Sequence, residues 1–293
     1  MFNLYGSWIK ISNRTHATDF YTNTCKDEKM TKFAFCKRED SPNCPWIMGH
    51  YWCGKERSQN MQTLRYESLL CNLPQLEPKI LLEQIGSGNT LWYIGDSMTS
   101  EMYISTLCLL KEFALPEYKK GDVKQVPNFR SNKLRVSTTS CVEFINLRSV
   151  CFIKSRKVAE LSKVLPKLYE NNWKTNDFLV INYGLHLNST PKSAIRKAFS
   201  DNMHNFVNAR GEVALLWRET SPQHFMNPGG AFTRDKLNMP CVPLKEEDYT
   251  TANAYNLKIR ELLEELEVPI LEVWSVSAAR YDAHSNGECS HLC

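Results

Sequence analysis

The amino-acid sequence predicts an α/β fold, with a largely parallel sheet covered by helices on both faces. Short apolar runs near residues 91–94, 178–181, 213–217 and 270–274 are typical of strands buried on both sides. Two predicted helices, 98–113 and 252–266, lie between these runs, and alternating strands and helices favour a parallel sheet. With 293 residues, 42% of them hydrophobic and 23% charged, the chain has enough apolar material for one sizeable core.

The elements can be placed in chain order. The first buried strand, 91–94, ends at Gly95, and a helix is expected from Met98 to Phe113, because Pro116 then stops it. Residues 135–153 are rich in Val, Thr and Phe and predict either a hairpin or an insertion. Apolar residues spaced by three and four over 252–266 predict a helix that packs on the sheet.

Cysteine usage divides the chain near residue 75. Residues 1–75 are rich in cysteine, aromatic and polar residues without sustained periodicity, which predicts a loop-rich, disulfide-stapled N-terminal lobe packed on the catalytic domain of residues 76–293. The irregular spacing of the eleven cysteines favours disulfides over a zinc site. Sequons at Asn13 and Asn188 agree with an oxidising, secretory compartment.

Charge and hydropathy exclude several partners. The formal charge of +4 is small and not gathered in runs, and Lys119, Lys120 and Lys124 are read as a solvated loop, so no nucleic-acid partner is expected. No stretch approaches the roughly 18 apolar residues of a membrane span, and no leader pattern opens the chain. We therefore expect a membrane association only through an N-terminal anchor that this sequence lacks, and a truncated C-terminal tail.

The residues with the clearest chemical meaning lie at the first strand-to-helix junction. Gly95, Asp96 and Ser97 follow the strand directly, where parallel α/β folds place their ligands and where helix N–H groups can hold an oxyanion. Ser97 is the predicted nucleophile, whereas Asp96 is expected to cap the helix or brace the loop. Asn182 and Gly184 end a central strand and could contribute further oxyanion donors.

A base for this serine is expected near the C-terminus. Glu288 precedes His291 by three residues, so one loop could carry both the orienting acid and the base. His284, with Asp282 as its carboxylate, is the competing base. Arg218 and His224 are candidate substrate contacts, although a strand-end arginine is as readily explained by pairing with a carboxylate.

With these motifs, nearly the whole chain resembles the plant trichome birefringence-like polysaccharide O-acetyltransferases, within the PC-esterase branch of the SGNH/GDSL superfamily. Gly95-Asp96-Ser97 resembles the family's nucleophile motif, and residues 217–225, WRETSPQHF, resemble its R-T-x-S-P-x-H-F segment. Residues 288–293, ECSHLC, resemble its D-C-S-H-W-C block, and 4–8 and 71–74 resemble its opening and its C-x-L-P element.

The resemblance implies a three-layer α/β/α SGNH (flavodoxin-like) fold and an acyl-serine mechanism. Ser97, His291 and Glu288 would move an acetyl group from a donor to a polysaccharide hydroxyl in the Golgi lumen, without a metal or nucleotide cofactor. Two alternatives remain open at this point: an acetyl esterase that uses the same residues, and a non-catalytic glycan-binding relative.

The chain departs from the family at several positions. Ser100 and Glu101 stand where members usually have arginine and asparagine, and Glu288 stands in place of aspartate. The family's opening cysteine has no counterpart among residues 1–7. For the disulfides, we expect Cys25 to pair with Cys108, and Cys289 or Cys293 to pair with Cys241.

Overall fold

A computed structural model describes residues 6–10, 64–68, 77–118, 122–126, 136–155, 157–186, 192–207, 211–212, 214–236, 239–285 and 288–292. Most of the cysteine-rich N-terminal segment, both sequons and Cys293 lie outside these ranges. The chain divides into two compact units. Unit 1 contains Leu76–Thr220 and Tyr255–Leu271, and unit 2 contains Phe2–Gln75, Ser221–Ala254 and Glu272–Cys293. Unit 1 thus starts close to the predicted boundary, whereas residues 221–254 and 272–293 group with the N-terminal segment.

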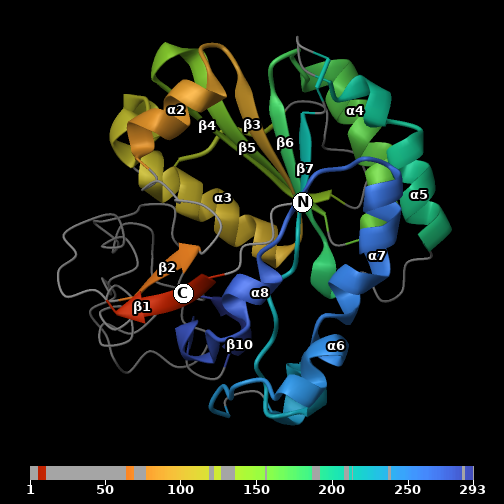
Figure 1. Ribbon diagram of the computed structural model, residues 1–293. Helices are drawn as coiled ribbons and strands as arrows, with labels where there is room; N and C mark the ends of the chain where they lie inside the picture. The colour runs from red at the N-terminus through yellow and green to blue at the C-terminus, as the bar shows by residue number, and fades with distance from the viewer. Residues whose placement is uncertain are drawn as a thin grey trace. The chain divides into compact units, whose positions relative to one another are not determined.

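Unit 1 is built on a six-stranded sheet in the order β4-β5-β3-β6-β7-β8 (Figure 1). The strands are β3 (Thr90–Gly95), β4 (Val136–Phe144), β5 (Arg148–Ser155), β6 (Phe178–Asn182), β7 (Leu215–Arg218) and β8 (Ile270–Leu271). All neighbouring pairs are parallel except β4 and β5, which are antiparallel. The central strand β3 is buried along its whole length, as its unbroken apolar run predicts.

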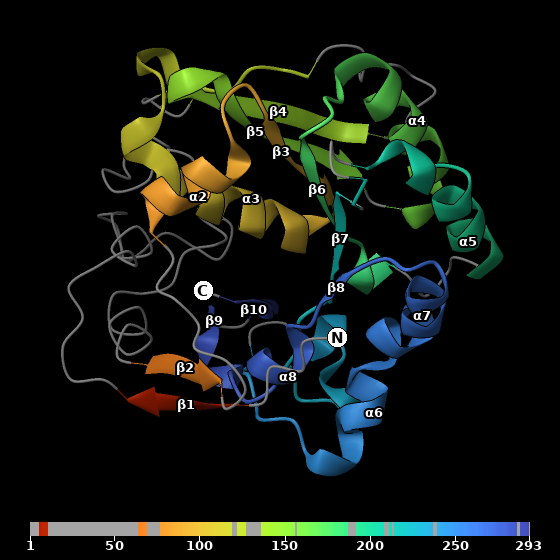
Figure 2. The same ribbon diagram turned by 45° about the horizontal axis from the view of Figure 1, so that its top comes forward.

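Helices cover both faces of this sheet, so the predicted three-layer α/β/α fold is confirmed. Helices α2 (Pro78–Ile85) and α3 (Ser97–Leu110) lie on one face, and α4 (Leu161–Asn172), α5 (Lys192–Ser200) and α7 (Ala254–Glu265) lie on the other (Figures 1 and 2). Alternate side chains of β3 serve the two layers: Trp92 and Ile94 join the core beneath α4, α5 and α7, whereas Tyr93 contacts Tyr103 of α3.

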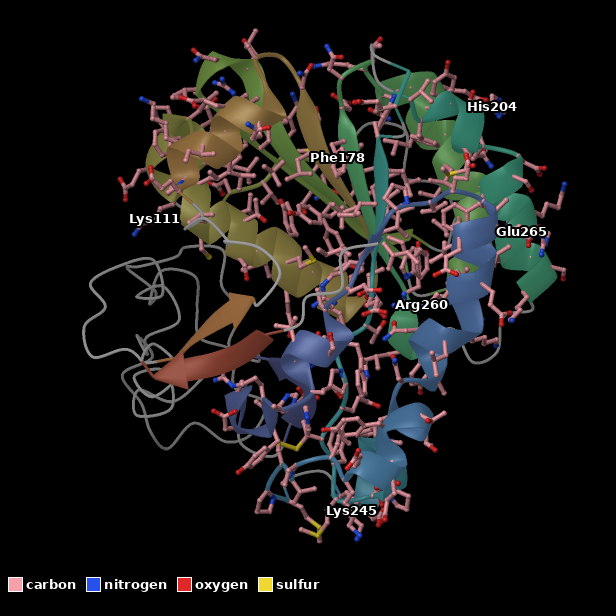
Figure 3. The ribbon with its side chains drawn as sticks, viewed as in Figure 1. Lys111, Phe178, His204, Lys245, Arg260 and Glu265 are labelled. Carbon is pink, nitrogen blue, oxygen red and sulfur yellow. A yellow bond between two sulfur atoms is a disulfide. The ribbon has the colours of Figure 1, made fainter. Side chains whose placement is uncertain are left out.

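The polar edges of the helices add little to this packing. Glu265, labelled on α7 in Figure 3, forms an ion pair with Arg196 of α5, and both side chains are at least half exposed. Exposed pairs of this kind contribute about 0–1 kcal/mol, so the apolar layer beneath them holds α5 and α7 to the sheet.

Several observed elements differ in detail from the predicted ones. The segment 135–153, for which the sequence predicted either a hairpin or an insertion, is a hairpin. Its second strand β5 pairs with the central strand β3. The helix expected over 98–113 ends at Leu110 and continues as a 3-10 turn, Lys111–Phe113. The helix expected over 252–266 is divided at Asn253 into α6 (Tyr249–Ala252) and α7.

The described part of unit 2 has little regular structure. It contains the antiparallel pair β1 (Gly6–Lys10) and β2 (Leu64–Ser68), and a second antiparallel pair, β9 (His284–Ser285) and β10 (Glu288–Leu292). Short helices, α6 and α8 (Trp274–Ser277), complete it together with 3-10 turns. Within the described ranges of the whole chain, no helix is long and apolar enough to cross a membrane.

Candidate active site

Ser97 is the first residue of α3 and follows the last residue of β3 by two positions. The buried carboxylate of Asp96 accepts a hydrogen bond from the Met98 amide at 3.0 Å, which confirms the prediction that Asp96 caps this helix. Ser97 itself is only partly buried. The junction therefore presents a serine hydroxyl at the positive end of a helix of 14 residues.

Gly95 allows the nucleophile loop to lie against the end of β6. A Cβ atom at this position would overlap the Asn182 carbonyl oxygen and the Thr99 hydroxyl. That carbonyl accepts hydrogen bonds from the Asp96 amide at 3.4 Å and from Thr99 Oγ1 at 3.0 Å. Glycine is needed here because two backbones approach too closely for any side chain.

Asn182 connects β6 to the segment that follows β7. Its Nδ2 group donates to the Arg218 carbonyl at 2.8 Å and to Thr220 Oγ1 at 3.0 Å, and the residue is fully buried. Both amide hydrogens are thus used inside unit 1. In this conformation Asn182 braces the loop, whereas the sequence had suggested that it donates to an oxyanion.

Thr220 is the centre of this bracing, and the sequence did not single it out. Asn256 of α7 accepts from the Thr220 amide at 2.8 Å and donates to its carbonyl at 3.0 Å. Gly184 lies so close that a Cβ atom there would overlap the Thr220 side chain. A polar residue on the buried face of the α7 pattern, Asn256, is the sequence signal that could have revealed the contact.

Arg218, at the end of β7, lies among carboxylates. Its Nη1 donates to the Glu219 carbonyl at 2.8 Å. Burial lowers the pKa of the Arg218 guanidinium, and the negative charges of Glu101 and Asp96 oppose that shift. Glu101, one of the departures from the family pattern, thus supplies a charge partner for Arg218, which agrees with the carboxylate-pairing interpretation of this arginine.

In unit 2, Glu288 and His291 are hydrogen-bonded to each other, as the predicted acid–base pair requires. Glu288 Oε2 accepts hydrogen bonds from His291 Nδ1 at 2.7 Å and from the His291 amide at 2.9 Å. Burial alone would raise the pKa of Glu288, but the hydrogen bond and charge of His291 lower it below its ordinary value. An ionised carboxylate on Nδ1 holds the proton there and leaves Nε2 as the basic nitrogen.

His224 and His284 lie deeper than expected, and both rings are fully buried. His224 Nδ1 is 2.6 Å from His284 Nε2, and the outer nitrogens reach the carbonyl oxygens of Ala278 and His291 at 2.9 and 2.8 Å. Each ring therefore uses both of its nitrogens internally. This corrects the expectation that His224 contacts substrate and that His284 competes as the base.

The carboxylate assigned to His284 also has a different partner. Asp282 accepts from Arg280 Nε at 2.9 Å and from Arg280 Nη2 at 3.2 Å. Because Arg280 is buried and needs a counter-charge, this bidentate pair accounts for Asp282.

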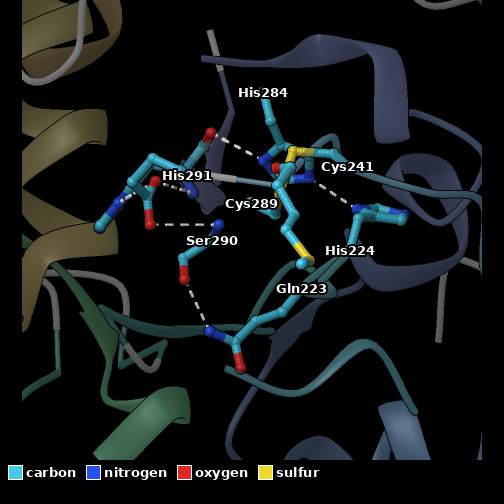
Figure 4. Close-up of a disulfide and its surroundings, with 9 residues drawn as sticks. Gln223, His224, Cys241, His284, Cys289, Ser290 and His291 are labelled. Atoms are coloured by element: carbon cyan, nitrogen blue, oxygen red, sulfur yellow. Dashed lines mark hydrogen bonds and ion pairs between the residues drawn. A yellow bond between two sulfur atoms is a disulfide. The ribbon is translucent and has the colours of Figure 1, made fainter. Parts of the chain in front are cut away.

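A disulfide holds the His291 segment. Cys241 and Cys289 are bonded, as one of the predicted pairings has it, and the Cys289 carbonyl accepts from the His224 amide at 2.9 Å (Figure 4). Gln223 Nε2 donates to Ser290 Oγ at 2.7 Å. The segment 223–224 thus contacts β10 at Cys289 and at Ser290.

Three cysteines of unit 1 are also disulfide-bonded. Cys108 is disulfide-bonded, and its partner lies outside the described residues, so the Cys25 pairing stays a prediction. Cys141 and Cys151 form a disulfide across β4 and β5 that the sequence analysis did not anticipate. Among the residues that the structure describes, no three His, Cys, Asp or Glu side chains form a group suited to a metal ion.

The predicted site residues therefore form two sets. Unit 1 holds Ser97 with its bracing partners, and unit 2 holds the Glu288–His291 pair with its supports. The predicted residues of unit 1 are Gly95, Asp96, Ser97, Asn182, Gly184 and Arg218, and those of unit 2 are His224, Asp282, His284, Glu288 and His291.

The chain is similar to a known protein family and to two plant proteins. Residues 73–210 match the PC-Esterase family, described as a GDSL/SGNH-like acyl-esterase family found in Pmr5 and Cas1p. The match includes Ser97 and Asn182 and ends before Glu288. Trichome birefringence-like 7 from Arabidopsis thaliana is 21% identical over 87% of this chain and 66% of the relative. Trichome birefringence-like 43 from the same plant is 32% identical over 26% of this chain and 21% of the relative.

The chain thus spans just under two thirds of the first of these relatives. Among solved structures, protein YXIM from Bacillus subtilis aligns with a TM-score of 0.38 at 13% identity, over 70% of this chain and 52% of that one. Residues 73–210 are thus similar to the PC-esterase family, and the resemblance of the chain to the trichome birefringence-like family is confirmed.

Proposed function

We propose that this protein is a serine-dependent O-acetyltransferase that moves an acetyl group through an acyl-serine onto a polysaccharide hydroxyl. The observation that carries the proposal is the 2.7 Å hydrogen bond between Glu288 Oε2 and His291 Nδ1, which leaves Nε2 to take a proton. The match of residues 73–210 to an acyl-esterase family supports the choice of an acyl group as the one transferred.

The first half of the reaction forms the acyl-enzyme. His291 Nε2 accepts the proton of Ser97 Oγ, and this oxygen attacks the carbonyl carbon of the acetyl donor. Backbone N–H groups at the start of α3 and at Gly184 stabilise the oxyanion, while Asn182 keeps its bracing role. The donor's leaving group departs with the proton from His291, and the acetyl group remains on Ser97.

The second half regenerates the enzyme. A sugar hydroxyl gives its proton to His291 and attacks the acetyl carbonyl, and Ser97 leaves and recovers the proton. If water replaces the sugar, the same steps hydrolyse the ester, so the outcome depends on how well the site excludes water. No metal or nucleotide takes part in any of these proposed steps.

We further propose that the protein works in the secretory pathway, in the Golgi lumen. Disulfides persist in oxidising compartments, and two complete ones are present among the described residues. As part of the same proposal, we expect the protein to be glycosylated and to act on polysaccharides of the cell wall.

Incubation with an acetyl ester, with and without xylan or another glycan, tests the proposal. We expect wild-type protein to transfer acetyl groups to the glycan faster than to water, and Ser97→Ala to do neither. Faster release of free acetate, whether or not glycan is present, would assign the esterase activity instead. Glycan binding without either reaction would identify a non-catalytic relative.

A further inference from the structure

We infer that His224 and His284 form a buried pair that shares one proton and positions His291. The two rings and the segment they support can be followed in Figure 4, where the bonds run from His224 through His284 to the His291 carbonyl. The positioning part rests on the proposed role of His291 as the base. The proton-sharing part does not.

The shared proton follows from counting donors. A carbonyl oxygen only accepts, so His224 Nε2 must donate to Ala278 and His284 Nδ1 must donate to His291. If both rings were neutral, these two donations would use their only protons. His224 Nδ1 and His284 Nε2 would then face each other at 2.6 Å with two bare lone pairs. One additional proton between these nitrogens converts that repulsion into a short, charge-assisted hydrogen bond.

Burial lowers the pKa of both His224 and His284, and nearby negative charges oppose that shift. The carboxylates of Asp282 and Glu288 act on His224 and His284 respectively, although Asp282 also pairs with Arg280 and Glu288 with His291. Burial, followed by repulsion from His224, lowers the pKa of His284 to about 4. Because repulsion from His224 is one cause of this shift, a positive charge on one ring opposes a second proton on the other.

The pair contacts the His291 strand at two points. His284 Nδ1 holds the carbonyl of His291 itself, and the His224 amide holds the carbonyl of Cys289. Glu288 controls the His291 ring and amide from the same strand. The imidazole of His291 is thereby oriented by one carboxylate, while its backbone is fixed by the pair. His284 is a positioning residue, because it is buried and reaches the base only through a backbone carbonyl.

Two substitutions of one residue separate these contacts. The side-chain nitrogen of asparagine lies near the position of histidine Nδ1, whereas that of glutamine lies near Nε2. His284→Asn therefore retains a donor to the His291 carbonyl and loses the contact with His224. His284→Gln retains a donor toward His224 and loses the bond to His291. We expect His284→Gln to lower kcat by about 10- to 100-fold with little change in KM, as for other supports of functional histidines, and His284→Asn to lose less.

His204→Gln is the matched control, because His204 is an exposed histidine of unit 1 that touches none of these groups. It should leave kcat and KM unchanged. Equal losses for the two His284 variants, or a larger loss for His284→Asn, would overturn the positioning role. If Ser97→Ala proves fully active, the proposed function fails, whereas the proton count is unaffected.

The proton itself is observable in the intact wild-type protein. In ¹⁵N-histidine NMR spectra near neutral pH, we expect one strongly downfield proton coupled to nitrogens of both rings, and its loss in His284→Asn. Two neutral rings without a shared proton would overturn the proton-sharing pair. Because this measurement needs neither substrate nor a variant that folds, it decides the point even if both His284 variants are unstable.

Discussion

Glu288 differs from the aspartate that the family resemblance leads one to expect, yet its longer side chain reaches both the ring and the amide of His291. We predict that Glu288→Gln lowers kcat by about 10²–10⁴-fold, because an amide can donate to Nδ1 and so favours the tautomer with its proton on Nε2. Glu288→Asp keeps the charge and should retain more activity. Steady-state kinetics on both variants checks this, and equal activity of Glu288→Gln and wild type would contradict it.

His284 makes stability depend on pH. Its pKa falls from 6.5 to about 4 in the folded protein, so between these values the unfolded chain binds the additional proton. The stability that this shift contributes is therefore fully present above pH 6.5 and is lost as the pH falls toward 4, by about 3 kcal/mol in total at 1.4 kcal/mol per unit. Urea unfolding at pH 7 and pH 5 should show this loss in the wild type and a smaller one in His284→Asn. An equal pH dependence in both proteins would rule out His284 as its source.

Among the elements, the junction of β3 with α3 is the most sterically constrained. Gly95→Ala should destabilise unit 1 by about 2–3 kcal/mol, because the new methyl group overlaps the Asn182 carbonyl and Thr99. Gly88→Ala is a suitable control: its φ is positive but its surroundings are open, so about 1 kcal/mol is expected. Urea-induced unfolding measures both. A smaller effect at Gly95 than at Gly88 would show that the close approach is not maintained in solution.

The two disulfides should contribute unequally. Cys241–Cys289 closes a separation of 48 residues and Cys141–Cys151 one of 10, which corresponds to about 4 and about 3 kcal/mol of lost chain entropy in the unfolded state. Replacing each pair by serines and comparing melting temperatures tests the order. The first replacement should also lower kcat, because it frees the strand that carries His291, whereas the second should not.

At the scale of the whole molecule, the apolar runs were sufficient to predict the parallel sheet, and the Gly95-Asp96-Ser97 junction was correct down to the Asp96 cap. Helices α4 and α5 were not predicted, although both bury apolar side chains in the same core. Periodicity also could not show that β5, from the suspected insertion, would pair with β3.

In the candidate site, too, local contacts could be predicted from the sequence and long-range contacts could not. Local spacing was enough to predict the contact between Glu288 and His291, three residues apart. The contact between His224 and His284 joins residues 60 positions apart, and both rings are buried, although the sequence suggested a substrate contact for His224 and a competing base in His284. Thr220 and Asn256 were missed for the same reason, since their importance depends on tertiary contacts that no local pattern encodes.

The central claim is that the hydroxyl of Ser97 reacts with the help of His291. Labelling by a fluorophosphonate probe, followed by mass spectrometry of the modified peptide, tests it most directly. We predict that the wild type and His204→Gln are labelled on Ser97 at equal rates, and that His291→Asn is labelled at least about 100-fold more slowly. Equally fast labelling of His291→Asn, or labelling at a residue other than Ser97, would contradict the claim.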